Sequence, residues 1–298
     1  MSVFSLVLPD FLLIGLGWLL FNRLRFSAEF FRGAEQLVFF VLFPALLFHS
    51  ITQTPLNFSD TYILLLASAG IVLLGVALSW LVVPILHPDP TDYASVSQCG
   101  YRFNTYIGLS LAGGLAGSTG QTIMAVLVGV AVPISNIAAV YTLARQNGGK
   151  VLREIVRNPF IIATVLALFC NFLRVPIPDA INVTLGRLGA CAIAIGLICV
   201  GTTLTMQGAH SAGKLMGMII TLRLMIMPLV ALFIGWFFEL SLVERQILLL
   251  FGALPTASST YVLAVRMGGN GRLVAATISI STLLSALTIP LWLMVGPS

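Results

Sequence analysis

Charged residues are scarce in this chain of 298 residues. Only 8% of the residues are Asp, Glu, Lys or Arg, whereas 58% are hydrophobic and the mean hydropathy is +1.04. An ordinary soluble domain carries about 25% charged residues, so a surface this poor in charge cannot be solvated by water. The composition therefore argues against a soluble enzyme, a nucleic-acid-binding protein and a disordered chain, and it predicts a chain solvated by lipid.

Clustered metal or redox ligands are also missing from the sequence. The three histidines lie far apart, and the four cysteines form no Cys-x-x-Cys pair. A zinc or redox centre needs several soft ligands close together, so we expect no metal and no cofactor, and we interpret the cysteines as small packing residues. The sequence has no Gly-Lys-Ser/Thr loop of the Walker type, so ATP is not expected to drive its activity. The cysteines are Cys99, Cys170, Cys191 and Cys199.

Acidic residues are absent from the middle of every long apolar run. The deepest is Asp10, in the outer half of the first run, and the others lie at ends or in polar breaks. Arg102 and Arg223 do fall inside apolar runs, where a charge is expensive and no acid accompanies it. For Arg102 we expect a path toward the aqueous surface, with attraction of an anionic substrate as the alternative. For Arg223 two interpretations stay open, namely bonds that tie helices together and direct contact with an anionic substrate.

Long apolar segments separated by short polar breaks fill the chain. A helix crosses a bilayer with about 20 apolar residues, and these segments are continuously apolar rather than alternating, which favours helices over a membrane barrel. We therefore expect an all-α membrane protein with ten transmembrane helices. The segments are Val3–Phe21, Glu35–Thr52, Thr61–Leu86, Ser95–Leu115, Gly120–Leu143, Pro159–Leu173, Ile181–Leu204, Gly213–Phe238, Arg245–Val265 and Arg272–Val295.

The basic residues indicate the orientation in the membrane. Of the 15 Lys and Arg residues, ten fall in loops on one side of the expected membrane and two in loops on the other. Since Lys and Arg mark the cytoplasmic side, both termini are expected on the outer side of a cell membrane. The polar linker 144–158 is then cytoplasmic and separates a first five-helix repeat, 1–143, from a second, 159–298. An odd number of helices in each half inverts the second half relative to the first.

The fourth and ninth segments are both interrupted by residues that disfavour a continuous helix. Asn104 and Pro255 each lie about 14–15 Å deep at about 1.5 Å per residue, near the middle of the hydrocarbon layer. Pro255 removes a backbone donor, and Asn104 and Thr105 can bond freed backbone groups or a ligand. One such residue alone is more often a kink, but paired breaks in matching helices of inverted halves indicate the binding site of a transporter.

Three segments in this order and spacing resemble the auxin efflux carrier family, which includes plant PIN-type carriers and bacterial malonate-transporter-like members. They are Val38–Phe48 in the second expected helix, Phe103–Leu109 in the fourth and Leu254–Ala257 in the ninth. The resemblance implies two inverted five-helix repeats with broken, crossing fourth and ninth helices, separate scaffold and transport domains, and elevator-like movement of organic anions. Ser110 departs from the family, many of whose members have a proline soon after the Asn-Thr motif, so the first crossover is expected to be less rigid.

The pattern and the resemblance together predict a secondary transporter of small organic anions, carboxylates of the malonate or auxin kind, working by alternating access. Its expected partners are the organic anion and the lipid bilayer, and a homodimer is left open. Two alternatives remain. One is a sodium-coupled organic-anion symporter, because freed carbonyls at a crossover can hold Na⁺, and the other is a membrane sensor without flux. A membrane-embedded enzyme would need a deep nucleophile–base pair or a metal cluster, and the sequence suggests neither.

The residues expected to bind substrate combine the two breaks with Arg223, which lies at a similar depth. Their polar side chains would contact the ligand, and the glycine and the proline would keep the backbone open. The N-termini of the half-helices would add partial positive charge that favours a carboxylate. The set from the first break is Asn104, Thr105, Tyr106 and Gly108. The set from the second break is Pro255, Thr256, Ser258 and Ser259.

Overall fold

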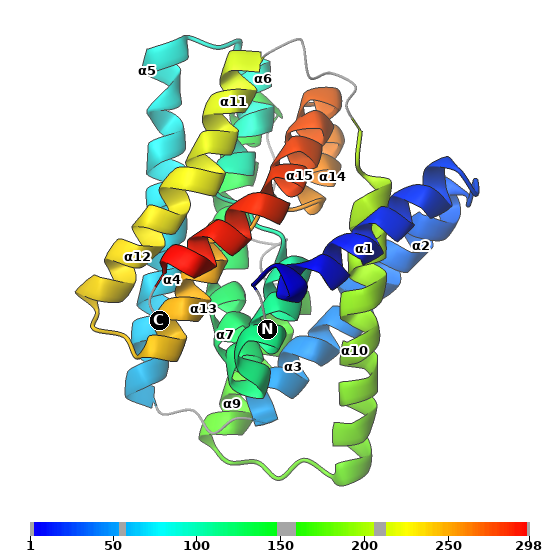
Figure 1. Ribbon diagram of the computed structural model, residues 1–298, viewed down its shortest axis with the longest axis vertical. Helices are drawn as coiled ribbons and strands as arrows, with labels where there is room; N and C mark the ends of the chain where they lie inside the picture. Colours follow the sequence, from blue (N-terminus) through cyan, green and yellow to red (C-terminus); the bar gives the residue numbers. More distant parts are fainter. Residues whose placement is uncertain (1–2, 54–57, 148–158, 206–212, 297–298) are drawn as a thin grey trace.

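The computed structural model describes residues 3–53, 58–147, 159–205 and 213–296. All regular structure in these ranges is helical, which confirms the expected all-α class (Figure 1). The first half contains α1 (Val3–Asn22), α2 (Ala28–Leu37), the π-helical η1 (Val38–Leu42), α3 (Phe43–Gln53), α4 (Phe58–Trp80), α5 (Val82–Leu86), α6 (Pro90–Val96), the 3₁₀-helical η2 (Ser97–Gly100) and α7 (Thr105–Asn147). The second half contains α9 (Pro159–Phe172), α10 (Asp179–Thr202), α11 (Gly213–Thr221), the π-helical η3 (Leu222–Ile226), α12 (Met227–Phe237), α13 (Leu242–Ala253), α14 (Ser259–Arg266) and α15 (Gly271–Val295).

Within the described ranges, 6 helical stretches are long and apolar enough to cross a membrane. Two further apolar stretches are shorter, namely Val7–Asn22 within α1 and Ile162–Phe172 within α9. The chain thus has the helices of a multi-pass membrane protein, and the arrangement of ten helices in two inverted repeats stays a prediction. The long stretches are Ala28–Gln53, Tyr62–Leu86, Pro90–Leu143, Asp179–Thr202, Gly213–Phe237 and Gly271–Val295.

The start of α2 is set by a capping residue and not by the start of the apolar run. The second apolar segment was expected to begin at Glu35, but the helix already begins at Ala28, where the Ser27 hydroxyl accepts a hydrogen bond from the amide of Phe30 at 3.1 Å. A serine at this position supplies a partner for an amide of the first turn, which would otherwise have none. The first turns of α2 are therefore amphipathic and precede the apolar run that marks the membrane segment.

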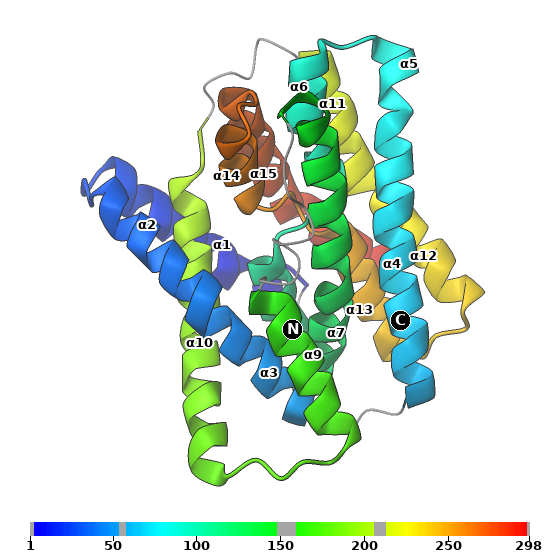
Figure 2. The same ribbon diagram turned by 180° about the vertical axis from the view of Figure 1, so that it is seen from behind.

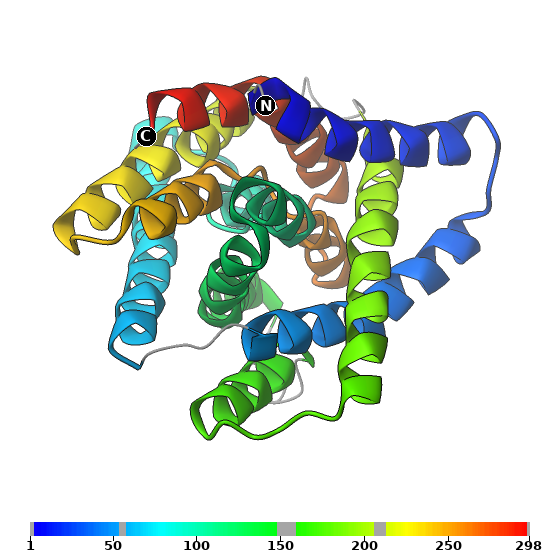
Figure 3. The ribbon, with the colours of Figure 1, turned by 60° about the horizontal axis from the view of Figure 1, so that its bottom comes forward.

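The helices fall into two groups that pack mainly within themselves. We call α1, α2, α3, α9 and α10 the lateral group, and α4, α7, α11, α12, α13 and α15, with the short elements beside them, the crossover group. Figures 1 and 2 show α10 beside α1 and α3 on one side of the molecule, with α4, α12 and α13 together on the other. α7 lies between the groups and packs against α3, α9 and α10 as well as α4 and α13 (Figure 3).

Glycines bring α1 and α10 into backbone contact. A Cβ atom added at Gly17 would lie 1.9 Å from the carbonyl oxygen of Ile198, and one added at Gly201 would lie 1.9 Å from the carbonyl oxygen of Ile14. Neither position has room for a side chain, as is common where membrane helices approach closely. The contact joins the second half of α1 to the C-terminal end of α10, where the two helices cross (Figure 3).

The long helix α7 consists of two helical parts joined by a sharp turn. The backbone leaves the helical region at Ala116 and at Gly117, whose φ is 58°. This left-handed conformation is open to glycine and strained for residues with a Cβ atom. The turn lies between the fourth and fifth apolar segments, where the sequence predicted a boundary.

Candidate functional site

Both interruptions expected from the sequence are present in the structure. The first helix stops at Gly100, the end of η2, and regular structure resumes at Thr105, the start of α7. The second stops at Ala253, the end of α13, and resumes at Ser259, the start of α14. We call residues 101–104 the first break and residues 254–258 the second break.

The two breaks are joined by direct hydrogen bonds. The amide of Asn104 donates to the carbonyl oxygen of Pro255 at 2.8 Å. The hydroxyl of Thr256 donates to the carbonyl oxygen of Cys99 at 2.9 Å, just before the first break. Backbone groups that a continuous helix would have paired are therefore paired across the two breaks, which is how non-helical backbone survives inside a membrane protein.

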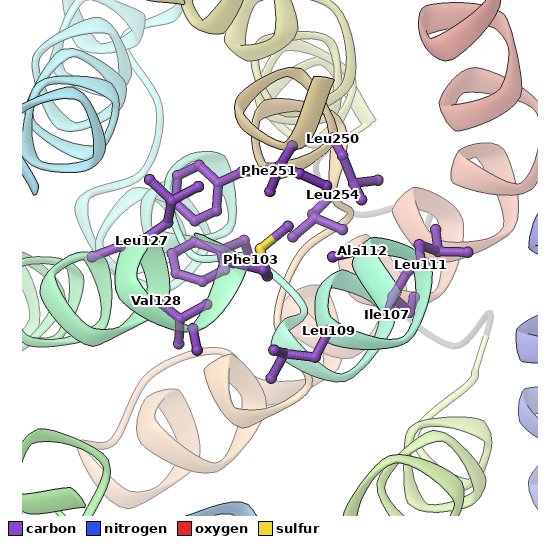
Figure 4. Close-up of a cluster of buried hydrophobic side chains, with 14 of the residues drawn as sticks. Phe103, Ile107, Leu109, Leu111, Ala112, Leu127, Val128, Leu250, Phe251 and Leu254 are labelled. Atoms are coloured by element: carbon purple, nitrogen blue, oxygen red, sulfur yellow. The ribbon is translucent and has the colours of Figure 1, made fainter. Parts of the chain in front are cut away.

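Apolar side chains surround this junction. Phe103 packs edge-on against Phe251, with their ring centroids 4.5 Å apart, and Figure 4 shows both rings near Leu127 and Leu254. A Cβ atom at Gly108 would lie 2.8 Å from the Cδ1 atom of Leu254, so the glycine lets the second break approach α7 closely. Gly108 was expected to keep the backbone open, but its amide donates to the carbonyl oxygen of Asn104 as in a helix, so that expectation is wrong.

Asn104 has one hydrogen-bonding group in use and one without a partner among the described residues. Its side-chain oxygen caps α7 by accepting from the amides of Tyr106 and Ile107 at 3.1 and 3.2 Å. The side chain is 1% exposed, and its Nδ2 atom has no hydrogen-bond partner among the described residues. A buried donor without a partner costs on the order of 1–3 kcal/mol, so this donor is a candidate ligand contact.

More of the polar groups at the second break have hydrogen-bond partners than at the first. Pro255 has no amide hydrogen, the amide of Thr256 donates to the Ser281 hydroxyl of α15 at 3.0 Å, and the Thr256 side chain is committed to Cys99. The carbonyl oxygens of Phe251, Gly252 and Leu254 all accept from a single side chain, that of Arg223.

Arg223 therefore caps the C-terminal end of the broken helix α13 through hydrogen bonds to its carbonyl groups. Its guanidinium lies in the π-helical turn η3, is 1% exposed, and supplies donors to carbonyl groups that have no intrahelical partner. A positive charge at a helix C-terminus also interacts favourably with the helix dipole. Of the two interpretations left open by the sequence, the structure contains the contacts of the first, and direct contact with substrate stays a prediction.

Arg102 joins the two breaks and does not extend to the surface. The side chain is 8% exposed and donates to Gln98 Oε1 and to the Ser259 hydroxyl, both at 3.1 Å. The expectation that it reaches water is therefore wrong. The position of Arg102 along its apolar segment suggested that the side chain reaches the aqueous surface. In the structure, η2 and the first break direct the side chain toward α14 instead.

The remaining expected site residues lie at different places around the junction. Thr105 and Ser258 are half-buried at the starts of α7 and α14, and Ser259 is exposed apart from its bond to Arg102. Tyr106 turns toward the lateral group, where its ring packs edge-on against Phe43 with centroids 5.1 Å apart. Tyr106 thus belongs to the boundary between the two helix groups.

Sequence reasoning missed a contact beside the first break. The Ser110 hydroxyl donates to Asp10 Oδ1 at 2.7 Å, and Asp10 is 5% exposed. Counting residues along α1 placed Asp10 in the outer half of its own segment, but it did not show that α1 packs against α7. An acid in an apolar helix was the available signal, because such residues are usually functional.

The long apolar helices of the structure agree with the similarity of this chain to known membrane transport proteins. The family described as membrane transport protein matches residues 2–150 and 142–293. The chain belongs to this family. A relative from Rhizobium meliloti (strain 1021) named "Putative malonate transporter" is 25% identical over 302 residues, covering 97% of this chain and 94% of the relative. The "Uncharacterized transporter YfdV" of Escherichia coli (strain K12) is 26% identical over 306 residues, covering 97% and 96%.

Membership in the membrane transport protein family confirms the resemblance stated from the motifs. It makes the chain a member of a family of membrane transporters, as the sequence predicted, and the similarity extends over nearly its whole length. The relatives are named as transporters, in agreement with an expected function that is not enzymatic.

Proposed function

We propose that this protein is a secondary transporter that moves small organic anions across the membrane by alternating access, with the crossed breaks as the binding site. The observation that carries the proposal is the Nδ2 atom of Asn104, a buried donor that has no partner in the described ranges and lies where two broken helices meet. A ligand carboxylate would accept this hydrogen bond and relieve the unpaired donor.

Several features at the junction favour negative charge. The helices α7 and α14 begin at the breaks, and helix N-termini carry partial positive charge. Arg102 lies between them, and its side-chain hydrogen bonds in the described part of the chain are to the neutral side chains of Gln98 and Ser259. Neither break contains an acidic residue. Malonate is the first probe, because a relative is named for it, and an auxin-like monocarboxylate is the second.

The burial of Asn104 supports alternating access. A donor that is covered by protein meets a ligand only after neighbouring helices separate, first toward one side and then toward the other. The two helix groups provide a boundary along which the crossover group would move past the lateral group in the manner of an elevator. Two inverted five-helix repeats, 1–143 and 159–298, remain part of the proposal, and 148–158 of the linker 144–158 lie outside the described residues.

Orientation belongs to the same proposal. Both termini would face the outer side and the linker the cytoplasm, as the basic residues predict. In a variant without the four native cysteines, a cysteine at Gly148 should resist an impermeant reagent added from outside and react after permeabilisation. Labelling from outside would contradict the orientation.

The decisive test is exchange of labelled malonate in liposomes that contain the purified protein. Asn104→Ala should abolish exchange while the protein remains folded and inserted. Asn22→Ala is the matched control, since Asn22 is exposed at the end of α1. Exchange at the wild-type rate by Asn104→Ala would show that the breaks are not the site. Repeating the assay with sodium gradients examines the sodium-coupled alternative, and wild-type binding without any flux would favour the sensor.

A further inference from the structure

The contact between Asp10 and Ser110 bridges the two helix groups. Asp10 lies on α1 of the lateral group, and Ser110 lies on α7 of the crossover group, six residues after Asn104 and so about 9 Å farther along the helix. The bond uses one carboxyl oxygen, Oδ1. The other, Oδ2, is buried and has no hydrogen-bond partner in the described part of the chain.

An ionised carboxylate in this setting would lack most of what stabilises it. A carboxylate accepts several hydrogen bonds or pairs with a cation when it is buried, whereas Asp10 has one neutral hydroxyl. A protonated carboxyl needs fewer hydrogen bonds and no cation, because it carries no charge. The arrangement therefore accommodates the neutral form more easily than the charged form, and an acid so placed in a membrane helix marks a proton or ion pathway.

No other charge compensates Asp10 from the helices packed against α1. These helices are α7, α10 and α15. The contact of Ile14 with Gly201 lies at the C-terminal end of α10, whereas Arg187 lies about 21 Å back along that helix. None of the titratable side chains on these three helices bonds to Asp10 within the described residues. Those described are Tyr106 and Tyr141 on α7, Asp179, Arg187, Cys191 and Cys199 on α10, and Arg272 on α15.

We propose that Asp10 takes up and releases one proton in each transport cycle, so that the organic anion travels together with a proton. This inference rests on the proposed function. The proton joins the Asp10 carboxylate from water on one side of the membrane and leaves to water on the other, and no bond in the substrate changes. A charged Asp10 repels an anion at the first break, and a neutral Asp10 does not.

The surroundings suit a proton better than a metal cation. The hydrogen bond described at Asp10 joins one carboxyl group to one hydroxyl, whereas hard cations such as Ca²⁺ and Mg²⁺ take about six oxygen ligands. The described residues also contain no group of three or more His, Cys, Asp or Glu side chains placed to hold a metal ion.

The size of the effect follows from the separation. Two unit charges roughly 10 Å apart at an effective dielectric constant of about 20 repel enough to change an affinity on the order of tenfold. Protonation of Asp10 should therefore strengthen anion binding on the order of tenfold, and an acidic outer solution should drive accumulation of the anion.

The experiment compares wild-type protein with Asp10→Asn, which resembles the neutral form permanently. In liposomes, an inward proton gradient should stimulate labelled malonate uptake by wild type on the order of tenfold, and Asp10→Asn should exchange malonate without responding to the gradient. Comparison of the two proteins at each pH cancels the titration of malonate itself. Glu29→Gln on the exposed start of α2 is the matched control and should respond like wild type.

Infrared difference spectra give a readout that needs no substrate. Wild type minus Asp10→Asn should show the carbonyl band of a protonated carboxyl that disappears as the pH rises. Ser110→Ala should move the pH profile of uptake to higher pH, because the charged form loses its hydrogen bond, and this variant decides the matter if Asp10→Asn does not fold.

The outcomes separate the two proposals. An equal response of Asp10→Asn and wild type to the proton gradient, or the absence of the titrating band, overturns the role of Asp10. A sodium gradient that replaces the proton gradient and depends on Asp10 also overturns it. The titrating band without any malonate exchange supports Asp10 as a proton site and counts against malonate as the cargo.

Discussion

The two breaks look alike in the sequence and differ in how their polar groups are held. At the second break, Arg223 covers three carbonyl groups and Thr256 is bonded through both its amide and its hydroxyl. At the first break, Asn104 caps α7 with its oxygen and leaves its nitrogen without a partner. Paired interruptions therefore need not contribute equally. The second break is anchored, whereas the first leaves a donor without a partner among the described residues, and we propose that a ligand meets this donor.

Replacement of Arg223 should give the largest loss of stability. Arg223→Met leaves buried carbonyl groups of α13 without partners, which costs on the order of 1–3 kcal/mol each and is partly offset by removal of a buried charge. We expect a fall in the melting temperature in detergent, with Arg187→Met, at an exposed arginine of α10, unchanged.

A second replacement, Arg223→Gln, separates the two interpretations of Arg223. A carboxylate should bind wild type more tightly than its neutral amide by about 1–3 kcal/mol. If the arginine only anchors α13, this difference persists in Arg223→Gln. A smaller difference in a protein of normal stability would place the guanidinium against the ligand.

Asn104→Asp should separate capping from binding at the first break. Aspartate caps a helix as well as asparagine does, and the positive end of α7 offsets part of the cost of burying its charge, so the loss of stability should stay small beside the loss of affinity. The substitution removes the Nδ2 donor and adds a negative charge, so anion affinity should fall more than about tenfold, by the 1.4 kcal/mol or more that a lost charge-assisted hydrogen bond is worth. Binding isotherms and thermal melts on one preparation make the comparison. Parallel losses of both would mean that the cap is the whole role of Asn104.

Thr256→Val should have the smallest effect. It deletes the bond to Cys99 and keeps the shape of the side chain, so we expect a loss of about 1 kcal/mol in stability. Malonate affinity should stay within about twofold of wild type, because the hydroxyl is already committed within the protein. A large loss of affinity at normal stability would return Thr256 to the ligand contacts that the sequence suggested.

Local sequence signals predicted the breaks well. Asn104 and Pro255 interrupt apolar runs, and the backbone is non-helical beside both, because a missing donor and a competing side chain act on neighbouring residues only. The start of α2 at Ala28 could also have been read from the capping residue Ser27.

Contacts between distant segments were harder to predict. Arg102 was assigned a path to water, and Asp10 was left in the outer part of its helix. Their actual partners, Ser259 and Ser110, lie 157 and 100 residues away in the chain. Depth along one helix is a one-dimensional quantity, and it carries no information on the tilt of that helix or on the neighbours it meets.

The backbone contact between α1 and α10 also limits how the protein can move. Gly17 lies against the backbone of Ile198, and Gly201 lies against that of Ile14. Because neither position has room for a side chain, sliding one helix along the other would bring larger residues against the backbone of the other helix. We therefore expect α1 and α10 to move together as one rigid unit. In the proposed mechanism, a displacement that opens a path to Asn104 would then occur where α7 and α15 pack against this pair of helices.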